Sequence, residues 1–219
     1  QESILQEIGY YFTTDKECVY SAFVSLIVDS DIYAKEITAL ELREYFIKQG
    51  IRMRLLDGDK RIIPQVELIN KEYRCSFKSL KEGLIDRNEF TECIETINNE
   101  QSFVISGNAG YGKSGCTEAI LNYCEKEDIP YIAIKLDRRI PHGNSEIWGQ
   151  ELGFAGSIVY ALNAISKDKT AVLVLDQLDA LRWTQANSSE ALAVCMEMIR
   201  QVGYLNYERA KKIVIVFVC

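Results

Sequence analysis

Histidine, long apolar runs and excess positive charge are the features that this sequence of 219 residues lacks. His142 is the only histidine, and no two of the seven cysteines have C-x-x-C spacing, so a zinc site is not expected. The longest apolar run, residues 213–219, is much shorter than the roughly 20 residues of a membrane span. We therefore expect neither a membrane segment nor a secretory signal.

The sequence carries more acidic than basic residues, which bears on the kind of surface that the protein can bind. The chain has 25 Lys and Arg against 32 Asp and Glu, which gives a net charge of −7 and a pI near 5.0. This balance argues against a broad surface for nucleic acid or for an anionic membrane, although it is compatible with a local basic patch.

The hydrophobic content of 47% allows a substantial core, either in one large domain or in one domain with a small partner. Four cysteines, at positions 93, 116, 124 and 195, lie on apolar helix patterns, which favours reduced core thiols and a cytoplasmic location. The chain has no initiating Met and stops inside a strand pattern, so we expect a fragment of a longer protein.

A phosphate-binding motif lies in the middle of the chain, in the stretch SFVISGNAGYGKSGCTEAI. Gly107, four further residues, Gly112, Lys113 and Ser114 fit the pattern G-x-x-x-x-G-K-[ST]. The Lys113 ammonium would contact the β- and γ-phosphates of a nucleotide, and the Ser114 hydroxyl would bind Mg²⁺. The residues expected to bind nucleotide in this motif are Gly107, Asn108, Ala109, Gly110, Tyr111, Gly112, Lys113, Ser114, Gly115 and Cys116.

The flanks of this motif have the context that a phosphate loop requires. Residues 102–106 predict a buried strand before the loop. Behind the loop, apolar residues with helical spacing predict a helix that ends near Glu127: Cys116, Ile120, Tyr123 and Cys124. The order of strand, loop and helix directs backbone N–H groups and the positive end of the helix dipole at a polyanion.

A second acidic motif follows the apolar run 171–175. Asp176 ends this run at the carboxyl edge of a predicted sheet, where ligands of open α/β sheets collect, so we expect it at the metal site with Ser114. Asp179 could activate the attacking water or cap the next helix, and both roles stay open. Gln177 is neutral and cannot accept a proton, which predicts slow turnover.

From about residue 80 onward, strand patterns alternate with helix patterns, which predicts an α/β fold with a parallel sheet flanked by helices. The expected strands are 102–106, 131–136, 171–175 and 213–218. The helix before the last strand has an apolar face that we expect to be buried, made of Leu192, Cys195, Ile199 and Val202. This pattern predicts one domain over residues 80–219.

Residues 1–79 predict a separate, mostly helical module. Thr14 and Glu17 have capping-box spacing before a first helix, and a second helix pattern covers about 32–49. Residues 51–66 alternate around Asp57-Gly58 and predict a hairpin whose second strand is limited to an edge by Pro64. The hairpin is basic, with Arg52, Arg54, Lys60 and Arg61. It is either the wing of a winged-helix-like nucleic-acid module or a solvated hairpin in a scaffold.

The segments GLIDRNEF, GNAGYGKS and VLVLDQLDAL resemble the STAND class of P-loop NTPases, the signal-transduction ATPases with numerous domains, over about residues 80–219. Asp176 and Asp179 match the two acids of the class pattern D-G-x-D-E. Gln177 and Ala180 replace its Gly and its final Glu, so the identity of the catalytic base stays open. Leu84 to Arg87 matches the segment that lines the adenine pocket in this class, which implies base contacts from Ile85 and Arg87.

This resemblance implies a sheet of the additional-strand class, in which strand 102–106 lies next to 213–218 and strand 171–175 lies beyond it. It also implies ATP and Mg²⁺ as cofactors, with Lys113, Asp176 and Asp179 as the catalytic residues. In such a protein nucleotide binding holds a conformation, and the full-length chain oligomerises to activate a signalling or defence-type effector.

Two other functions stay open at this point. One is a phosphotransferase, whose acceptor would bind near Arg138 and Arg139 in the loop LDRRIPHGN. The other is a non-hydrolysing platform in which the nucleotide is structural and the N-terminal module is an adaptor or a DNA reader. The guanine-reading pattern N-K-x-D is absent from the sequence, so the preference for ATP over GTP depends on the resemblance.

Overall fold

The computed structural model divides the chain into two compact units, Gln1–Leu55 and Leu56–Cys219, and each is considered by itself. It describes residues 4, 5, 8, 12, 14–29, 37, 39–52, 61–76, 88–167, 169–182 and 188–219. The division falls before helix α4 (Ile62–Cys75), so α4 belongs to the larger unit although it precedes the expected boundary near residue 80. None of the described helices has the length and apolar character needed to cross a membrane.

The smaller unit contains helices α2 (Lys16–Val28) and α3 (Ala39–Lys48). Asp15, and not the expected Thr14, caps α2, because its carboxylate accepts hydrogen bonds from the N–H groups of Glu17 and Cys18. The Thr14 hydroxyl instead accepts a bond of 2.8 Å from the Arg52 N–H. The core of this unit is aromatic and aliphatic, with Ile8, Phe12, Val19, Phe46 and Ile51 buried.

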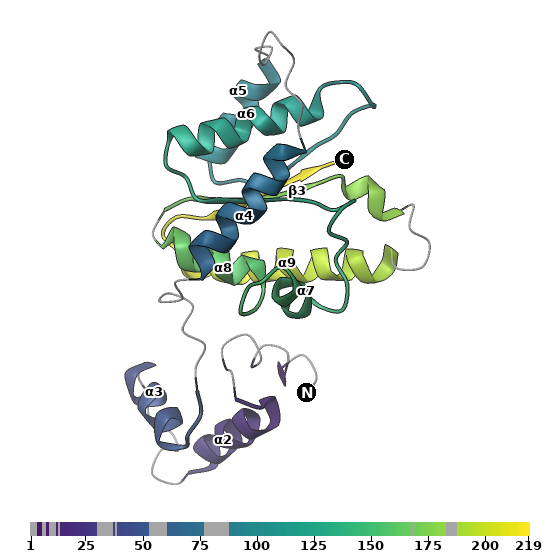
Figure 1. Ribbon diagram of the computed structural model, residues 1–219. Coiled ribbons are helices and arrows are strands. Elements are labelled where there is room, and N and C mark those ends of the chain that lie inside the picture. Colours follow the sequence, from purple (N-terminus) through teal and green to yellow (C-terminus); the bar gives the residue numbers. More distant parts are fainter. Residues whose placement is uncertain are drawn as a thin grey trace. The chain divides into compact units, whose positions relative to one another are not determined.

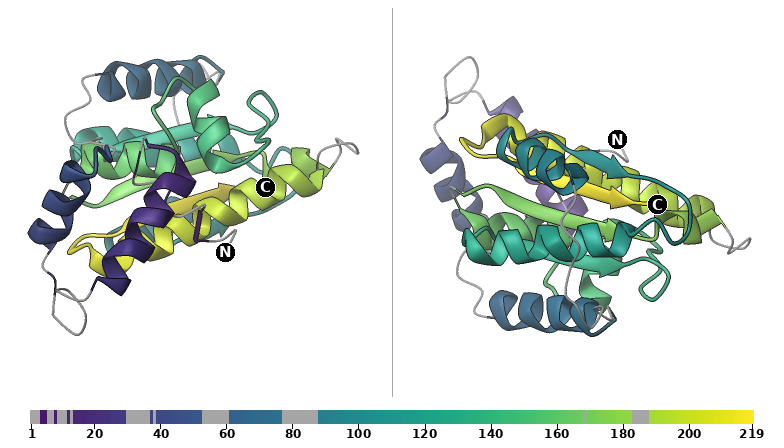
Figure 2. Two further views of the ribbon diagram at one scale, coloured as in Figure 1. Left: turned by 90° about the horizontal axis from the view of Figure 1, so that it is seen from below. Right: turned by 90° about the horizontal axis from the view of Figure 1, so that it is seen from above.

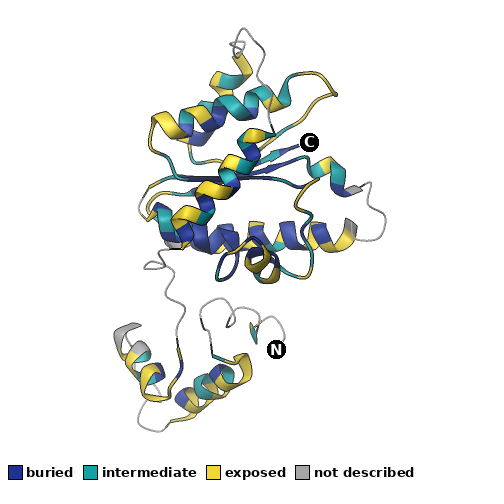
Figure 3. Cartoon of the chain, in the orientation of Figure 1, coloured by how far each residue is buried: buried dark blue, intermediate teal, exposed yellow. Residues whose placement is uncertain are grey.

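The larger unit is built on a parallel sheet of four described strands: β1 (Phe103–Ile105), β2 (Tyr131–Lys135), β3 (Ala171–Asp176) and β4 (Ile213–Val218). Their order is β1-β4-β3-β2, with Val216 of β4 paired to both Phe103 and Val174. The order confirms the expected placement of strand 213–218 between the strand before the phosphate loop and the strand that ends at Asp176. β3 up to Leu175 and the whole of β4 are apolar and mostly buried, as strands covered on both faces require (Figure 3).

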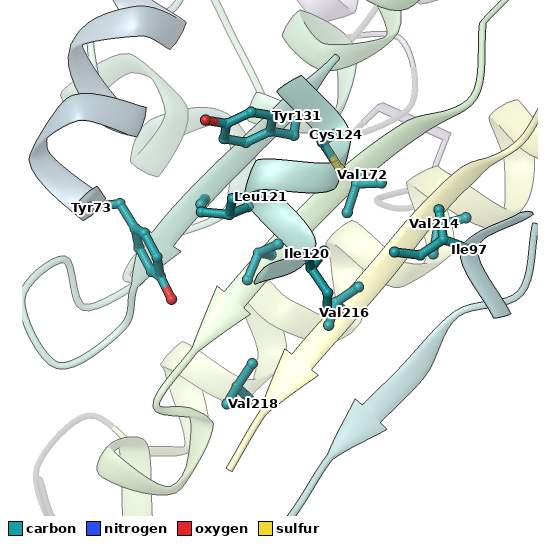
Figure 4. Packing of buried hydrophobic residues seen from close by; sticks show 12 residues of the cluster. Tyr73, Ile97, Ile120, Leu121, Cys124, Tyr131, Val172, Val214, Val216 and Val218 are labelled. Carbon is teal, nitrogen blue, oxygen red and sulfur yellow. The ribbon is translucent and has the colours of Figure 1, made fainter. Parts of the chain in front are cut away.

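Helices cover both faces of this sheet (Figures 1 and 2). Helices α5 (Asn88–Asn98) and α6 (Lys113–Lys126) pack on one face. On the other face, α8 (Ile158–Ser166) contacts β3 and α9 (Ser188–Glu208) contacts β4, with α7 (Ser145–Glu151) against both helices. Figure 4 shows the core under α6, where Ile120 and Leu121 lie over Val172, Val214 and Val216.

Helix α4 covers the outer edge of β2. The Asn70 side chain donates to the Tyr131 carbonyl and accepts from the Ala133 N–H, both at 2.9 Å. One amide therefore replaces a neighbouring strand at this edge, which would otherwise present unpaired backbone groups. This packing also brings the C-terminal half of α4 to the carboxyl ends of the strands.

The structure corrects the expected hairpin over residues 51–66. Its second strand is wrong, because residues 62–75 form α4, and its tip at residues 53–60 lies outside the described part of the chain. Pro64 lies in the first helical turn, where the missing N–H has no cost. The helical signal was the spacing of Ile62, Val66, Ile69 and Tyr73, all of which are buried. The winged-helix interpretation depended on this hairpin as its wing, and the second strand of the hairpin is a helix.

Two burial predictions are also corrected. The strand before the phosphate loop was expected to be buried, but Val104 is 57% exposed because β1 ends the row of described strands. On α9, Cys195 and Val202 are buried as expected, whereas Leu192 and Ile199 are exposed. The buried face is instead centred on Ala191, Val194, Cys195, Met198, Val202 and Leu205. The buried face of α9 is rotated relative to the expected one because α9 packs against both α7 and the sheet.

Candidate functional site

A cleft of about 1350 Å³ opens at the carboxyl edge of the sheet. Its walls are α5, β1, the loop 109–112, one side of α6 along its length, and the ends of β3 and β4. The cleft brings together the predicted residues Lys113, Ser114, Asp176 and Asp179, although 60 residues and more separate the two motifs in sequence. Gly107 and Asn108 precede the part of the loop that lines it.

The loop has the backbone conformation that glycine permits. Gly110 and Gly112 have φ values of 85° and 83°, in the left-handed region where side chains are strained. Gly112 is also the N-cap of α6, and the Cys116 N–H makes the first helical bond back to its carbonyl at 3.0 Å. The N–H groups of the first turn precede this ladder and lie in the cleft wall, at the positive end of the helix dipole.

The Lys113 side chain folds back over the loop. Its ammonium donates to the Gly107 carbonyl at 2.5 Å and to the Asn108 carbonyl at 3.2 Å. The charge is therefore held at the centre of the loop by carbonyl groups and not by a carboxylate. Such a cation can exchange carbonyl contacts for an anionic ligand without breaking an ion pair.

Asp176 is almost fully buried, with 2% of its surface exposed. Its Oδ2 accepts a 2.9 Å hydrogen bond from the Tyr73 hydroxyl, and its Oδ1 accepts one of 2.8 Å from the Gln177 N–H. Burial raises the pKa of Asp176, while the Tyr73 bond and the Lys135 charge act in the opposite direction. The net result is a pKa above the usual value, so a positive charge beside Asp176 would favour its ionised form.

Tyr73 is a site residue that the sequence reasoning missed. It lies on α4, is 5% exposed, and has its ring centroid 5.9 Å from the Lys135 ammonium. Burial, followed by the nearby Asp176 charge, raises the pKa of Tyr73, so its hydroxyl remains a donor. The helical spacing with Ile69 and Val66 was the signal that could have placed it on the buried face of a helix.

Gln177 and Asp179 also line the cleft. Gln177 has a left-handed φ of 62°, which turns the chain out of β3 and into the short 3-10 helix Leu178–Arg182. Asp179 is exposed in the first turn of that helix. Its carboxylate is therefore available to water in the cleft, and its exposure distinguishes it from the buried Asp176.

The wall formed by α5 was not expected. Phe90, Cys93 and Thr96 of α5 line the cleft together with Asn122 and Tyr123 of α6. Such a surface, apolar with a few polar groups, suits a flat organic ring beside the phosphate loop. Ile85 and Arg87, which the family resemblance implies for base binding, lie outside the described residues.

In the loop LDRRIPHGN, where a phosphate acceptor would bind, charged side chains pair with other residues of the protein. Arg139 forms a salt bridge of 2.8 Å with Glu72, and His142 contacts Glu151 at 2.7 Å. The Ile140 carbonyl, followed by Glu151, raises the pKa of His142. No residue of 137–143 is among those lining the cleft in the described part of the chain.

Comparison with known proteins gave no assignment, since no protein-family model and no curated protein match the sequence. The cleft itself combines a flexible ammonium, a helix N-terminus and a buried carboxylate. A ligand that meets all three requirements is a polyphosphate accompanied by a divalent cation.

Proposed function

We propose that the cleft binds ATP with Mg²⁺, and that the larger unit is a P-loop NTPase domain that works as a slow switch of the STAND type. The observation that carries this proposal is that the phosphate-binding motif and the acidic motif line the same cleft. The loop before α6 and Asp176 at the end of β3 both line it, and β4 lies between their strands. Each motif alone occurs in many folds, whereas the pair in this strand order suits phosphoryl transfer.

The phosphate chain would lie over the N-terminus of α6. Lys113 would leave the carbonyl groups of Gly107 and Asn108 and donate to the terminal phosphates. The glycines at 110 and 112 let the backbone approach the phosphate oxygens closely. The apolar wall of α5 and Tyr123 would receive the adenine ring.

The residues at the carboxyl edge fit a hard divalent cation. Ser114 offers an exposed hydroxyl, and Asp176 offers a carboxylate whose two donors leave lone pairs on both oxygens. The bound Mg²⁺ would neutralise charge that develops on the phosphates during transfer. Asp176 remains ionised more readily with such a charge beside it, which offsets the raised pKa.

The attacking water would be oriented from the 3-10 helix that follows Asp176. Asp179 is the only exposed carboxylate among the residues 176–182, and it can accept a proton, whereas Gln177 can only donate and accept hydrogen bonds. Hydrolysis would transfer the γ-phosphoryl group to water and leave ADP and phosphate. A base that is one turn away from the metal ligand favours holding the nucleotide over rapid turnover.

Calorimetric titration of the chain with ATP and Mg²⁺ tests this proposal. Lys113→Ala should weaken binding about 10- to 150-fold, the range for a hydrogen bond to a charged group, with an unchanged circular dichroism spectrum. Lys71→Ala is the matched control, because Lys71 is an exposed lysine on α4 away from the cleft. Equal ATP affinity in the parent and in Lys113→Ala would contradict the proposal.

Phosphate release distinguishes the alternatives. Release without an added acceptor supports the ATPase, whereas transfer that requires an acceptor would support a phosphotransferase. The ion pairs of Arg139 and His142 give the second function no support in the described residues. Tight binding without any release would support a structural nucleotide.

A further inference from the structure

Two thiols approach each other inside the cleft. Cys93 on α5 and Cys116 in the first turn of α6 have their sulfur atoms 3.8 Å apart. Both side chains are half-buried and both line the cleft, so small solutes reach them. Of the remaining cysteines, Cys124 and Cys195 are buried in the core and Cys18 and Cys75 are exposed on other helices, whereas Cys219 after β4 is half-buried and also lines the cleft.

We propose that Cys93 and Cys116 form a modification site, a dithiol that a peroxide oxidises to a disulfide between α5 and α6. A disulfide requires the sulfur atoms to approach to about 2.05 Å. The two helices already pack against each other, and the sulfur atoms are in contact, so rotation about the two side chains with a small helix adjustment covers the remaining distance.

The chemistry balances with hydrogen peroxide as the oxidant. One thiolate attacks a peroxide oxygen, the O–O bond breaks, and a sulfenic acid forms as hydroxide takes up a proton to give water. The second thiolate then attacks the sulfenic sulfur, forms the S–S bond and expels a second hydroxide, which also becomes water. Two thiols and one peroxide give one disulfide and two waters, and the sulfur atoms supply both electrons.

The surroundings of the pair set its rate. The hydrogen bond with Cys116, followed by burial, raises the pKa of Cys93, and the nearby Glu92 and Glu89 act in the same direction. Cys93 itself therefore reacts slowly with peroxide, because the thiolate is the nucleophile.

The disulfide has a consequence for the cleft, which rests on the proposed nucleotide binding. Cys116 lies three residues after Lys113, so a covalent bond to α5 fixes the first turn of α6 against α5. A nucleotide in the cleft would cover both thiols and slow their oxidation. The disulfide would also hold the first turn of α6 in one position, so we expect it to weaken nucleotide binding, and couplings of this kind are commonly about 5- to 150-fold.

Peptide mapping by mass spectrometry tests the modification site. The whole chain is treated with hydrogen peroxide, free thiols are blocked, and the digest is analysed without reductant. We expect one cross-linked pair of peptides containing Cys93 and Cys116, lost in Cys93→Ser and in Cys116→Ser and retained in Cys75→Ser. Oxidation of either cysteine without the cross-link, or pairing with another cysteine, would overturn the inference.

The second measurement is the ATP affinity of reduced, oxidised and re-reduced protein. We expect the oxidised form to bind about 10-fold more weakly and the re-reduced form to recover. An unchanged affinity with the cross-link present would overturn the coupling. A cross-link in a protein whose reduced form binds no ATP would refute the proposed function and leave the modification site standing, and ATP binding without a cross-link would do the reverse.

Discussion

The Tyr73 hydroxyl donates a hydrogen bond of 2.9 Å to Oδ2 of Asp176, and this bond joins α4 to the carboxyl end of β3. The other oxygen of Asp176 is held by the Gln177 N–H. The carboxylate is therefore fixed in orientation by two donors from different segments before any ligand binds. A helix that precedes the phosphate loop by some 30 positions thus positions the residue that we propose at the metal site.

Replacing Tyr73 by Phe should move the acid limit of nucleotide binding to higher pH. The tyrosine bond lowers the pKa of Asp176, so its removal raises that pKa further. Because the proposed metal site needs the carboxylate, binding is lost as the pH falls through this pKa. A lost bond to a charged group corresponds to a shift of about one pH unit. Calorimetry with ATP and Mg²⁺ across a pH series measures the limit.

Tyr131→Phe is the control for that series. This variant also loses a partly buried hydroxyl, which donates to Glu125 at 2.8 Å and accepts from Arg74 of α4 at 3.2 Å but makes no bond to Asp176. Both variants should lose some stability, whereas only Tyr73→Phe should shift the pH limit. A shift of equal size in both would assign the effect to general loosening of α4.

Asp176→Asn should stabilise the fold while it removes Mg²⁺-dependent nucleotide binding. Burial raises the pKa of Asp176 in the folded chain, so the folded state binds a proton more readily than the unfolded state. The cost of the buried charge is present above the folded pKa and is relieved as the pH falls through it. At neutral pH the amide should therefore raise the melting temperature, and for a chain of this size each 1 kcal/mol corresponds to about 2–4 °C.

Calorimetric melting at neutral and at mildly acidic pH checks the sign. The advantage of Asp176→Asn should shrink toward acid, because the parent carboxyl is then protonated as well. A variant that melts below the parent at neutral pH would show that the carboxylate is held more favourably than its surroundings indicate.

Asn70→Ala should lower the free energy of unfolding of the larger unit. Its amide makes two hydrogen bonds to the backbone of β2, and alanine leaves the Tyr131 carbonyl and the Ala133 N–H without those partners. The expected loss is about 1–3 kcal/mol of unfolding free energy, measured by urea denaturation. Asn98→Ala, which loses an exposed bond to Tyr123, should cost much less. Equal losses would contradict the role of Asn70 as a cover for the strand edge.

The sequence predicted the parts of the fold that local pattern determines. The strands ending at Ile105 and Asp176 are short and apolar, and the glycines at 110 and 112 are needed at left-handed φ, so both motifs were visible as local signals. Parallel strands end at one edge of a sheet, so the two motifs were expected to meet there.

The contribution of α4 to the site was not visible in the same way. Asp57-Gly58 and the alternation around it favoured a hairpin, and Pro64 was taken to limit its second strand to an edge, whereas it lies in the first turn of a helix. The pairing of Tyr73 with Asp176 joins residues more than 100 positions apart, and neither has a local signal for it. Likewise, the rotation of the buried face of α9 depends on which neighbours share its packing, which periodicity alone does not contain.

The last prediction concerns the rate of hydrolysis. An arginine supplied from a neighbouring subunit is commonly worth about 10³ to 10⁵ in turnover, and the cleft has no arginine among its described lining residues. The chain should therefore hydrolyse ATP far below the roughly 1 to 100 s⁻¹ of kinases. Asp179→Asn should lower this rate by about 10²- to 10⁴-fold with nearly unchanged ATP affinity, because Asp179 is exposed and would act on water. Single-turnover assays with radiolabelled ATP decide this, and an unchanged rate in Asp179→Asn would return Asp179 to the role of a cap in the turn after β3.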